Sequence, residues 1–357
     1  MADRMIKIKL SIPGFENDLN LSQFLGNAEN TFQNCKFYVN DSNIKEVDFW
    51  FVMDDLQELK ESVIVDPDNI YFISAEVVYP KGYYDTEDKL KFLDQFAKII
   101  SCHDIFRENA TFDIPFLGWM INANHGPSIF GKTYRDINWL SNLDTLEKKN
   151  KISVFCSNKI TTPDHQLRYK FVKILKKHFG DSLDWYGNGI QSVAQKWDGI
   201  APYKYHIALE NQSRHNIITE KIYDSYLGLA YPIYWGAPNL NEYFPKQSFT
   251  RIEIFDWRNS IKKIEHVLLR QEWEKSLPLL IQCKNKVLTD YNPYQRIGKM
   301  TINDHNLTAV KKERVELHSA YSLYCRLNGG FAGRIINKSG RALQWGGSWL
   351  INASYGK

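Results

Sequence analysis

The stretch at residues 203–245 constrains the fold more than any other part of the chain. An apolar-rich run at 204–209 predicts a buried strand, and a polar loop follows at 212–216. After Thr219, apolar residues recur at helical spacing. A second strand is predicted at 231–235, and Gly236 ends it. This pattern is typical of a β-loop-α-β unit, and its polar side chains fall at the loop end, where open α/β sheets bind ligands.

Lys221 is the most informative residue of this unit, because it falls in the first turn of the predicted helix. The partial positive charge of a helix N-terminus disfavours a cation there. A bound anion reverses this preference, since free backbone N–H groups and the ammonium then converge on it. Phosphate is the obvious anion, and a solvated lysine paired with Asp224 or Glu220 is the alternative.

Strands and helices alternate on both sides of this unit, which predicts an α/β protein with two Rossmann-like domains. We place an N-terminal domain at 1–145, a second domain at 146–300, and a C-terminal helix and tail at 301–357, with the polar stretch 140–151 as linker. The predicted strands lie at 7–12, 48–53, 69–74, 151–155, 183–186 and 252–257. The predicted helices lie at 86–99, from Asp164 onwards, and at 261–276, and the segment 310–327 is amphipathic.

Two other ionisable residues lie where ligands are bound in such folds. Arg168 falls in the first turns of the helix that Asp164 could cap, which repeats the unusual placement of Lys221. Two such cations near the loop ends of neighbouring strands would neutralise a diphosphate. Glu76 follows the strand at 69–74. A solvated helix arginine and a surface or capping glutamate are the alternatives.

The net charge of +4 is too small for a nucleic-acid-binding protein, and no dense Lys/Arg stripe is interleaved with aromatic residues. Residues 296–341 are locally basic, which suits peripheral association with an anionic membrane, with a solvated face as the simpler alternative. The N-terminal residues contain no apolar stretch long enough for a signal peptide or a membrane span. We therefore expect a cytoplasmic protein.

The motifs ALEN at 208–211, TEK at 219–221 and PIYWGAPNLNEYFP at 232–245 resemble the donor-binding signature of the α-1,3/1,4-fucosyltransferases, glycosyltransferase family 10. Weaker similarity extends over residues 71–257. The resemblance implies the GT-B architecture, in which two Rossmann-like domains face each other across a cleft. It also implies an inverting transfer of L-fucose from GDP-fucose to a hydroxyl of a glycan acceptor, with an α-1,3-type linkage.

The resemblance assigns roles to particular residues. In the family, the phosphate-binding arginine comes after an S-N motif. Arg168, which comes after Ser157 and Asn158, matches this arginine, and Lys221 matches the lysine of the family's T-E-K motif. The motif glutamate, which serves the donor sugar or ribose, matches Glu220, and the catalytic base matches Glu76. The remaining donor-binding candidates are Glu210, Asn211, Thr219, Tyr186 and Gly187.

Neither a metal nor another cofactor is expected beyond the donor GDP-fucose. Metal-dependent sugar transferases hold their cation with a D-x-D motif, and Asp66-Pro67-Asp68 has this spacing. The internal proline and the following Asn69 instead favour a turn. The five cysteines show no C-x-x-C or Cys/His metal spacing, which is typical of free thiols in a reducing compartment.

The sequence departs from the family at Ile217, where relatives carry an aromatic residue, usually tyrosine. An isoleucine cannot donate a hydrogen bond. Either His215 or Asn216 compensates, or the donor sugar differs. A second hypothesis therefore keeps the fold with another nucleotide-linked sugar, and a third is a catalytically inactive glycan-binding protein. The acceptor is expected to be selected by the loops at 79–84 and 122–130.

Overall fold

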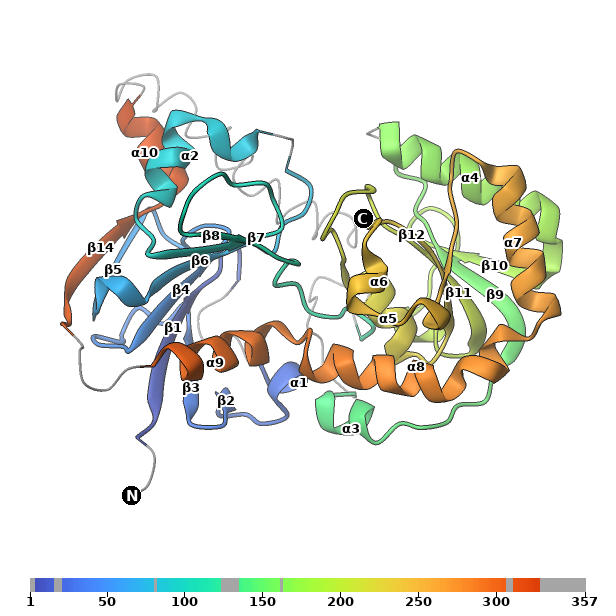
Figure 1. The fold of residues 1–357 in the computed structure, drawn as a ribbon, viewed down its shortest axis with the longest axis horizontal. Helices are drawn as coiled ribbons and strands as arrows, with labels where there is room; N and C mark the ends of the chain where they lie inside the picture. Colours follow the sequence, from blue (N-terminus) through green and yellow to red (C-terminus); the bar gives the residue numbers. More distant parts are fainter. Residues whose placement is uncertain are drawn as a thin grey trace. The chain divides into compact units, whose positions relative to one another are not determined.

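The computed structural model describes residues 4–15, 21–79, 82–122, 135–160, 163–305 and 311–327. These residues form two compact α/β units (Figure 1). The first unit contains the chain up to Phe116 and resumes at Pro293, and the second contains the chain from Leu117 to Asn292. Each unit has its own sheet of mainly parallel strands, so the prediction of two Rossmann-like domains is confirmed. No helix in the described ranges is long and apolar enough to cross a bilayer.

The first unit is built on a seven-stranded sheet of order β2-β3-β1-β4-β6-β7-β8, in which β2 alone runs antiparallel to its neighbour. Its strands are β1 Ile6–Ser11, β2 Thr31–Phe32, β3 Cys35–Val39, β4 Phe49–Met53, β6 Ile70–Ile73, β7 Lys98–Ser101 and β8 Ala110–Phe112. Strand β4 reads FWFVM and is buried throughout, as a strand covered on both faces requires.

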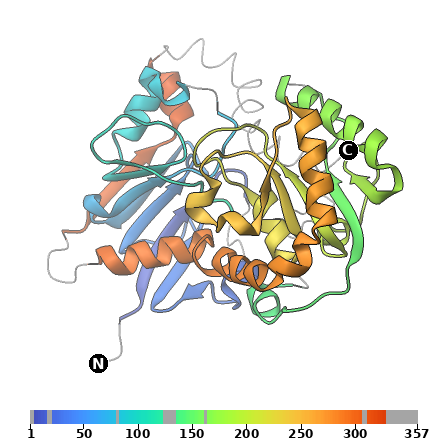
Figure 2. The same ribbon diagram turned by 45° about the vertical axis from the view of Figure 1, so that its right-hand side comes forward.

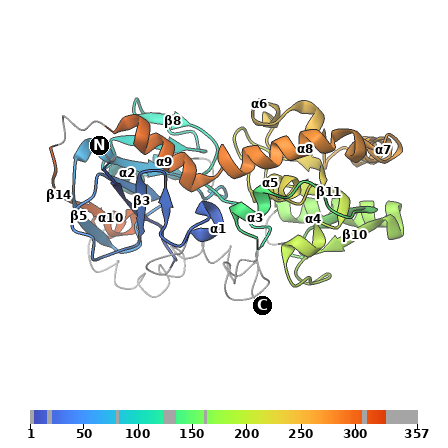
Figure 3. The same ribbon diagram turned by 90° about the horizontal axis from the view of Figure 1, so that it is seen from below.

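Elements from distant parts of the chain complete the first unit. Helix α9 (Pro293–Asp304) packs against α1 (Ser22–Leu25) and β3, as Figure 3 shows. Strand β14 (Glu313–His318) pairs antiparallel with β5 (Lys60–Val65), and helix α10 (Ala320–Leu327) packs against α2 (Glu87–Leu93). Two short 3-10 helices lie at Pro67–Asn69 and Tyr83–Asp85.

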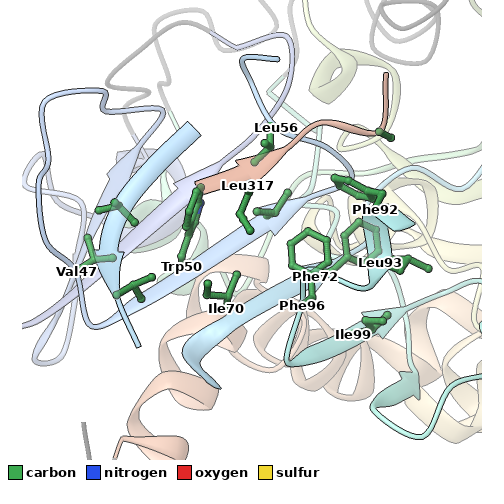
Figure 4. Packing of buried hydrophobic residues seen from close by; sticks show 14 of the residues in the cluster. Val47, Trp50, Leu56, Ile70, Phe72, Phe92, Leu93, Phe96, Ile99 and Leu317 are labelled. Atoms are coloured by element: carbon green, nitrogen blue, oxygen red, sulfur yellow. The ribbon is translucent and has the colours of Figure 1, made fainter. Parts of the chain in front are cut away.

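A buried hydrophobic cluster joins β5, β14, α2 and α10 to strands of the sheet (Figure 4). It includes Trp50 of β4, Phe72 of β6, Phe92 of α2 and Leu317 of β14. The ring centroid of Phe72 lies 5.9 Å from that of Phe92 and 5.5 Å from that of Phe96. Phe72 therefore occupies the middle of an aromatic group that links the sheet to the helix above it.

The second unit is a five-stranded parallel sheet of order β10-β9-β11-β12-β13. Its strands are β9 Lys149–Phe155, β10 Leu183–Tyr186, β11 Tyr203–Leu209, β12 Tyr231–Trp235 and β13 Thr250–Arg251. Its α-helices are α3 Ile137–Ser141, α4 Pro163–Phe179, α5 Glu220–Leu227, α6 Leu240–Tyr243, α7 Trp257–Leu269 and α8 Glu272–Thr289, with 3-10 helices at Gly180–Ser182, Lys196–Gly199 and Lys246–Ser248.

The strand order reverses between β9 and β11. The crossover from β9 to β10 through α4 and the crossover from β11 to β12 through α5 run in opposite directions along the sheet, so right-handed connections place α4 and α5 on opposite faces. Helix α7 packs beside α4 (Figure 2), and α8 packs against α5. Such a reversal leaves an opening at the carboxyl ends of the strands, which is where ligands bind in this kind of sheet.

Three secondary-structure predictions are wrong. The helix predicted at 86–99 ends at Leu93, and Ile99 and Ile100 lie in β7, where β-branched residues suit a buried strand. None of the predicted strand residues 252–257 lies in a strand: β13 ends at Arg251, and Asp256 caps α7 by accepting the N–H of Asn259. The helix predicted at 261–276 is split between α7 and α8 at Gln271, whose φ is 54°.

The C-terminal segment and the unit boundaries also differ from the prediction. The amphipathic segment at 310–327 is strand β14 followed by helix α10. The units divide at residue 116 and again at residue 292, whereas the sequence placed the boundaries at 145 and 300. The reason is long-range pairing, because Met120 donates its N–H to Asp224 of α5 while β14 pairs with β5. The predicted tail at 329–357 lies outside the described residues.

We predict that Phe72→Ala lowers the free energy of unfolding of the first unit by about 3–5 kcal/mol, since it removes a fully buried ring from the cluster. Phe106→Ala is the matched control, because Phe106 is 93% exposed and its loss is expected to change stability by less than about 0.5 kcal/mol. Urea unfolding followed by tryptophan fluorescence measures both. Equal effects of the two substitutions would contradict the description of this core.

Candidate functional site

Glu210 is the buried carboxylate around which the site of the second unit is built. It directly follows β11 and is 0% exposed. One of its oxygens accepts the backbone N–H of Thr219 at 2.9 Å, and the other accepts the hydroxyl of Thr219 at 2.6 Å. Burial raises the pKa of Glu210, against the opposing charge of Lys221. The two bonds attach the end of β11 to the start of α5.

Gly236 makes room for this carboxylate. A Cβ atom at residue 236 would lie 2.3 Å from the Cγ of Glu210 and 2.2 Å from the hydroxyl of Tyr234. Only glycine therefore allows the end of β12 to pass this close to the side chain of Glu210.

Thr219 and Lys221 form the beginning of α5. Thr219 is the N-cap residue, and its side chain accepts the N–H of Lys221. The Nζ of Lys221 lies 2.9 Å from Glu220 Oε1 and 3.5 Å from Glu210 Oε2, and the side chain is 19% exposed. Burial lowers the pKa of Lys221, but the charges of Glu220 and Glu210 outweigh burial and raise it. Lys221 is thus paired with Glu220, as one alternative had it, but it is not a solvated lysine.

Arg168 reaches the same end of the sheet from α4. It is 8% exposed, and its Nη1 donates a hydrogen bond to the side-chain oxygen of Asn211, the neighbour of Glu210. Its Nε is buried and has no hydrogen-bond partner among the residues that the structure describes. The charge of Arg168 lowers the pKa of Lys221, so the two cations lie close enough to repel each other. Two basic side chains with an unsatisfied guanidinium N–H are suited to an anion such as a pyrophosphate.

His165, one turn before Arg168 on α4, lies within the field of the same cations. Burial, together with the charges of Arg168 and Lys221, lowers the pKa of His165 to about 4. The imidazole is therefore neutral at physiological pH. His165 was not among the predicted site residues, although its spacing of three from Arg168 places both on one face of the helix.

Glu220 lies between two lysines. The second lysine is Lys196, whose Nζ lies 3.9 Å from Glu220 Oε1. The Nζ of Lys196 also lies 2.6 Å from Oδ2 of Asp224. Burial raises the pKa of Glu220, but Lys221 and Lys196 outweigh burial and lower it to about 2. Burial raises the pKa of Asp224 to about 6, against the opposing effect of Lys196. Glu220 is therefore held as a carboxylate in a buried ionic network.

Lys196 and Asp224 were not among the predicted site residues. Asp224 is four residues after Glu220 on a predicted helix, so helical spacing could have placed both carboxylates on one face. Lys196 lies on the 3-10 helix Lys196–Gly199, and no local pattern marks it. Lys196 pairs with Glu220 and Asp224 only because the fold brings this 3-10 helix next to α5.

The predicted donor residues after β9 and β10 lie on two adjacent loops. The N–H of Asn158 donates to the carbonyl of Asn188 at 3.1 Å, which ties the loops together. Gly187 has a φ of 147°, and a Cβ atom there would lie 2.7 Å from the backbone of Cys156. Gly187 is therefore needed for the close approach of the two loops. The structure places Ser157 next to Asn158 in the loop after β9.

Tyr186 was predicted to bind the donor, but its hydroxyl is used within the protein. It lies 2.6 Å from the hydroxyl of Tyr203, which donates to Asp184 at 2.7 Å. Burial raises the pKa of Tyr203, and its bonds to Tyr186 and Asp184 add to this effect. The hydroxyl of Tyr186 is thus part of an interstrand contact between β10 and β11.

Ile217 is 1% exposed, so its side chain packs inside the protein. The preceding Asn216 has a φ of 61°, and its Oδ1 accepts hydrogen bonds from the side chains of Asn239 at 2.8 Å and Tyr243 at 2.7 Å. The amide oxygen of Asn216 therefore holds this loop to Asn239 and Tyr243.

Glu76, the predicted base, belongs to the first unit. It follows β6 and is half-buried, and its Oε1 accepts the backbone N–H groups of Val77 and Val78, both at 2.9 Å. The carbonyl of Glu76 lies 2.7 Å from Nε2 of His103. Glu76 is thus at the carboxyl end of the parallel sheet of its own unit, as predicted. Of the predicted acceptor loops, residues 80–81 and 123–130 lie outside the described part of the chain.

Asp66-Pro67-Asp68 forms a turn, as predicted. The Asp66 side chain caps the 3-10 helix Pro67–Asn69 by accepting the N–H of Asp68, and its second oxygen accepts the N–H of Lys311 at 2.9 Å. Within the described ranges, no three His, Cys, Asp or Glu side chains are grouped so that they could hold a metal ion.

Comparison with known proteins places this site in a family context. Residues 145–276 match the family model for glycosyltransferase family 10 (fucosyltransferase) C-term. The α-(1,3)-fucosyltransferase FucT of Helicobacter pylori is 32% identical over 76 residues, which are 21% of this chain and 16% of that protein. The alignment therefore spans only a small part of that relative.

Two crystal structures of α1,3-fucosyltransferase are similar to the chain. One covers 77% of this chain and 81% of its own, with 16% identity and a TM-score of 0.48. The other, with GDP, covers 82% of this chain and 93% of its own, with 15% identity and a TM-score of 0.48.

We predict that Lys196→Met lowers the free energy of unfolding of the second unit by about 3–5 kcal/mol, because buried Asp224 and Glu220 lose a cation. Adding Asp224→Asn to Lys196→Met is expected to restore part of the loss. Lys151→Met is the control, since Lys151 lies 3.6 Å from Asp184 in a more exposed pair and is expected to cost less than about 1 kcal/mol. Denaturant unfolding measures all three, and a double variant no more stable than Lys196→Met would exclude the coupling.

Proposed function

Because residues 145–276 match the family model for glycosyltransferase family 10, we propose that the protein transfers L-fucose from GDP-fucose to a hydroxyl group of a glycan. One observation carries the proposal. Arg168 and Lys221 come from two different helices to one end of the parallel sheet, and within the described ranges the Nε of Arg168 has no hydrogen-bond partner. The matched segment contains both cations together with Glu210, Asn211 and Glu220.

Further observations support the proposed donor and the proposed linkage. The motifs at 208–211, 219–221 and 232–245 resemble the GDP-fucose-binding signature of the family. The relative that is 32% identical over 76 residues is an α-(1,3)-fucosyltransferase, and we propose the same linkage for this chain. The glycan acceptor itself is not specified by these residues.

In the proposed reaction, the bond between the fucosyl C1 and the oxygen of the β-phosphate breaks, and its electron pair stays on that oxygen. Arg168 and Lys221 neutralise the charge that develops on the departing GDP. A hydroxyl oxygen of the acceptor forms the new bond to C1 from the opposite side, and its proton passes to the carboxylate of Glu76. One displacement inverts the anomeric centre, so the β-linked donor yields an α-fucoside.

Glu220 has a positioning role in this proposal. Its carboxylate is ionised and accepts hydrogen bonds, so it can orient hydroxyl groups of the donor sugar or ribose. Lys196 and Lys221 prevent it from becoming protonated. The two side-chain cations take the place that a divalent metal has in other sugar transferases, and we propose that none is essential.

Ile217 favours a second candidate, in which the fold is kept and the donor is another nucleotide-linked sugar. The position holds an aliphatic side chain buried at 1% exposure, so it offers the donor no hydrogen bond. A transfer assay with several GDP-linked sugars distinguishes the two candidates. Transfer from GDP-fucose alone supports the first, and transfer from a different GDP-sugar alone supports the second.

We predict that wild-type protein binds GDP more tightly than UDP, CDP or dTDP, and that Lys221→Ala weakens GDP binding by about 1.5–3 kcal/mol through loss of a charge-assisted contact. Thermal shift and titration calorimetry measure this. The control is Lys177→Ala, an exposed lysine in the last turn of α4, which should leave the affinity unchanged. Failure of the wild type to bind any nucleotide diphosphate would favour an inactive glycan-binding protein.

We predict that Glu76→Gln lowers the rate of sugar transfer by about 10²–10⁴-fold, because the amide cannot accept the proton of the acceptor hydroxyl. Its affinity for GDP should stay close to the wild-type value, since Glu76 belongs to the other unit. Steady-state transfer kinetics and calorimetry test the two parts separately. Unchanged turnover in Glu76→Gln would exclude Glu76 as the base.

A further inference from the structure

Asp54 contacts the backbone of the turn that carries Glu76. It follows β4, the neighbour of β6 in the sheet. Its Oδ1 accepts the N–H of Ala75 at 2.9 Å and of Glu76 at 3.1 Å, and its Oδ2 accepts the N–H of Glu76 at 3.0 Å. A single side chain from one strand end therefore holds the backbone of the next strand end at the proposed base.

The backbone of Asp54 takes a costly conformation to make these contacts. Its φ is 64°, in the left-handed region, which non-glycine residues occupy at a cost. Its own N–H donates to the carbonyl of Ile73 at 3.0 Å, so the residue is bonded on both sides to the end of β6. The left-handed turn aims the carboxylate at residues 75 and 76.

The carboxylate of Asp54 also interacts electrostatically with the base. Burial and the charge of Glu76 together raise the pKa of Asp54 to about 7, although the N–H groups of Ala75 and Glu76 oppose this. The titratable groups that act on Asp54, or on which it acts, are Asp55, Glu76, Tyr79, Tyr84 and Cys102. Burial raises the pKa of Tyr79, Tyr84 and Cys102, so these three are neutral at physiological pH.

We propose that Asp54 is a positioning residue for Glu76: its carboxylate holds the turn at Ala75 and Glu76, and its negative charge makes Glu76 a stronger base. This inference rests on the proposed function in one respect, namely that Glu76 accepts the proton of the acceptor. The sign follows from repulsion. An ionised Asp54 favours a proton on the neighbouring Glu76, whereas a protonated Asp54 does not.

The pH dependence of catalysis tests the charge. Turnover of the wild type is expected to fall as the pH decreases through about 7, where Asp54 takes up its proton. Asp54→Asn keeps an acceptor oxygen for the backbone but carries no charge, so its turnover should be lower at pH 8 and should not show this step. The control is Asp94→Asn, since Asp94 forms an exposed ion pair with Arg107. A profile of Asp54→Asn that superimposes on the wild type overturns the proposal.

Hydrogen exchange tests the hold on the turn without any need for activity. The amides of Ala75 and Glu76 should exchange about tenfold faster in Asp54→Ala than in the wild type, whereas Asp54→Asn should protect them nearly as well. Equal exchange in the wild type and Asp54→Ala overturns the proposal. If the wild type transfers no sugar at all, the proposed function fails, and the exchange measurement still decides whether Asp54 holds this turn.

Stability gives a third reading that is also independent of activity. The pKa of Asp54 is raised in the folded protein, so the stability it contributes is present at low pH and is lost as the pH rises through about 7. The wild type should therefore lose thermal stability relative to Asp54→Asn between pH 5 and pH 8. A constant difference between the two melting temperatures over this range overturns the charge part of the proposal.

Discussion

The bond between Glu210 and Thr219 is the interaction on which the rest of the site depends. A buried carboxylate is costly unless its oxygens are paired, and Thr219 pairs both of them with its N–H and its hydroxyl. The same contact sets where α5 begins, and the start of α5 sets where Glu220 and Lys221 lie. Asn211, next in the chain, meets Arg168 of α4. One strand end thus determines the positions of two helices and of both cations.

In the second unit, buried acidic side chains are neutralised by lysine side chains that are themselves largely shielded from solvent. Glu210, Glu220 and Asp224 are all buried, and Lys196 and Lys221 are distributed among them. A buried network of this kind is a poor source of stability, because desolvation consumes most of the attraction. What it provides is a fixed geometry. The carboxylate of Glu220, whose pKa is about 2, keeps one protonation state and one orientation over the whole physiological range.

The central β-loop-α-β unit could be predicted from sequence because its signals are local. The signals are the continuous apolar runs of the strands, the Thr-Glu-Lys start of the helix and Gly236. Each of them depends only on residues that are close in the sequence. Strand β14 could not be recognised, since its partner β5 is about 250 residues away and each alone resembles an amphipathic segment. Lys196 was not predicted as a site residue for the same reason, because its ion-pair partners come from α5. Tyr186 was predicted to bind the donor, and the sequence does not reveal that Tyr203 lies opposite its hydroxyl.

The interrupted layout of the first unit has a consequence for biosynthesis. The described part of the second unit is continuous in sequence from Leu117 to Asn292, whereas the first unit needs α9, β14 and α10, which are translated after it. Leu317 of β14 is part of the same cluster as Trp50 and Phe72, so this apolar surface stays open until the ribosome has released residues beyond 317. The domain that begins first must therefore finish second. Nascent chains that stall after residue 292 would expose the β5 edge and would need a chaperone.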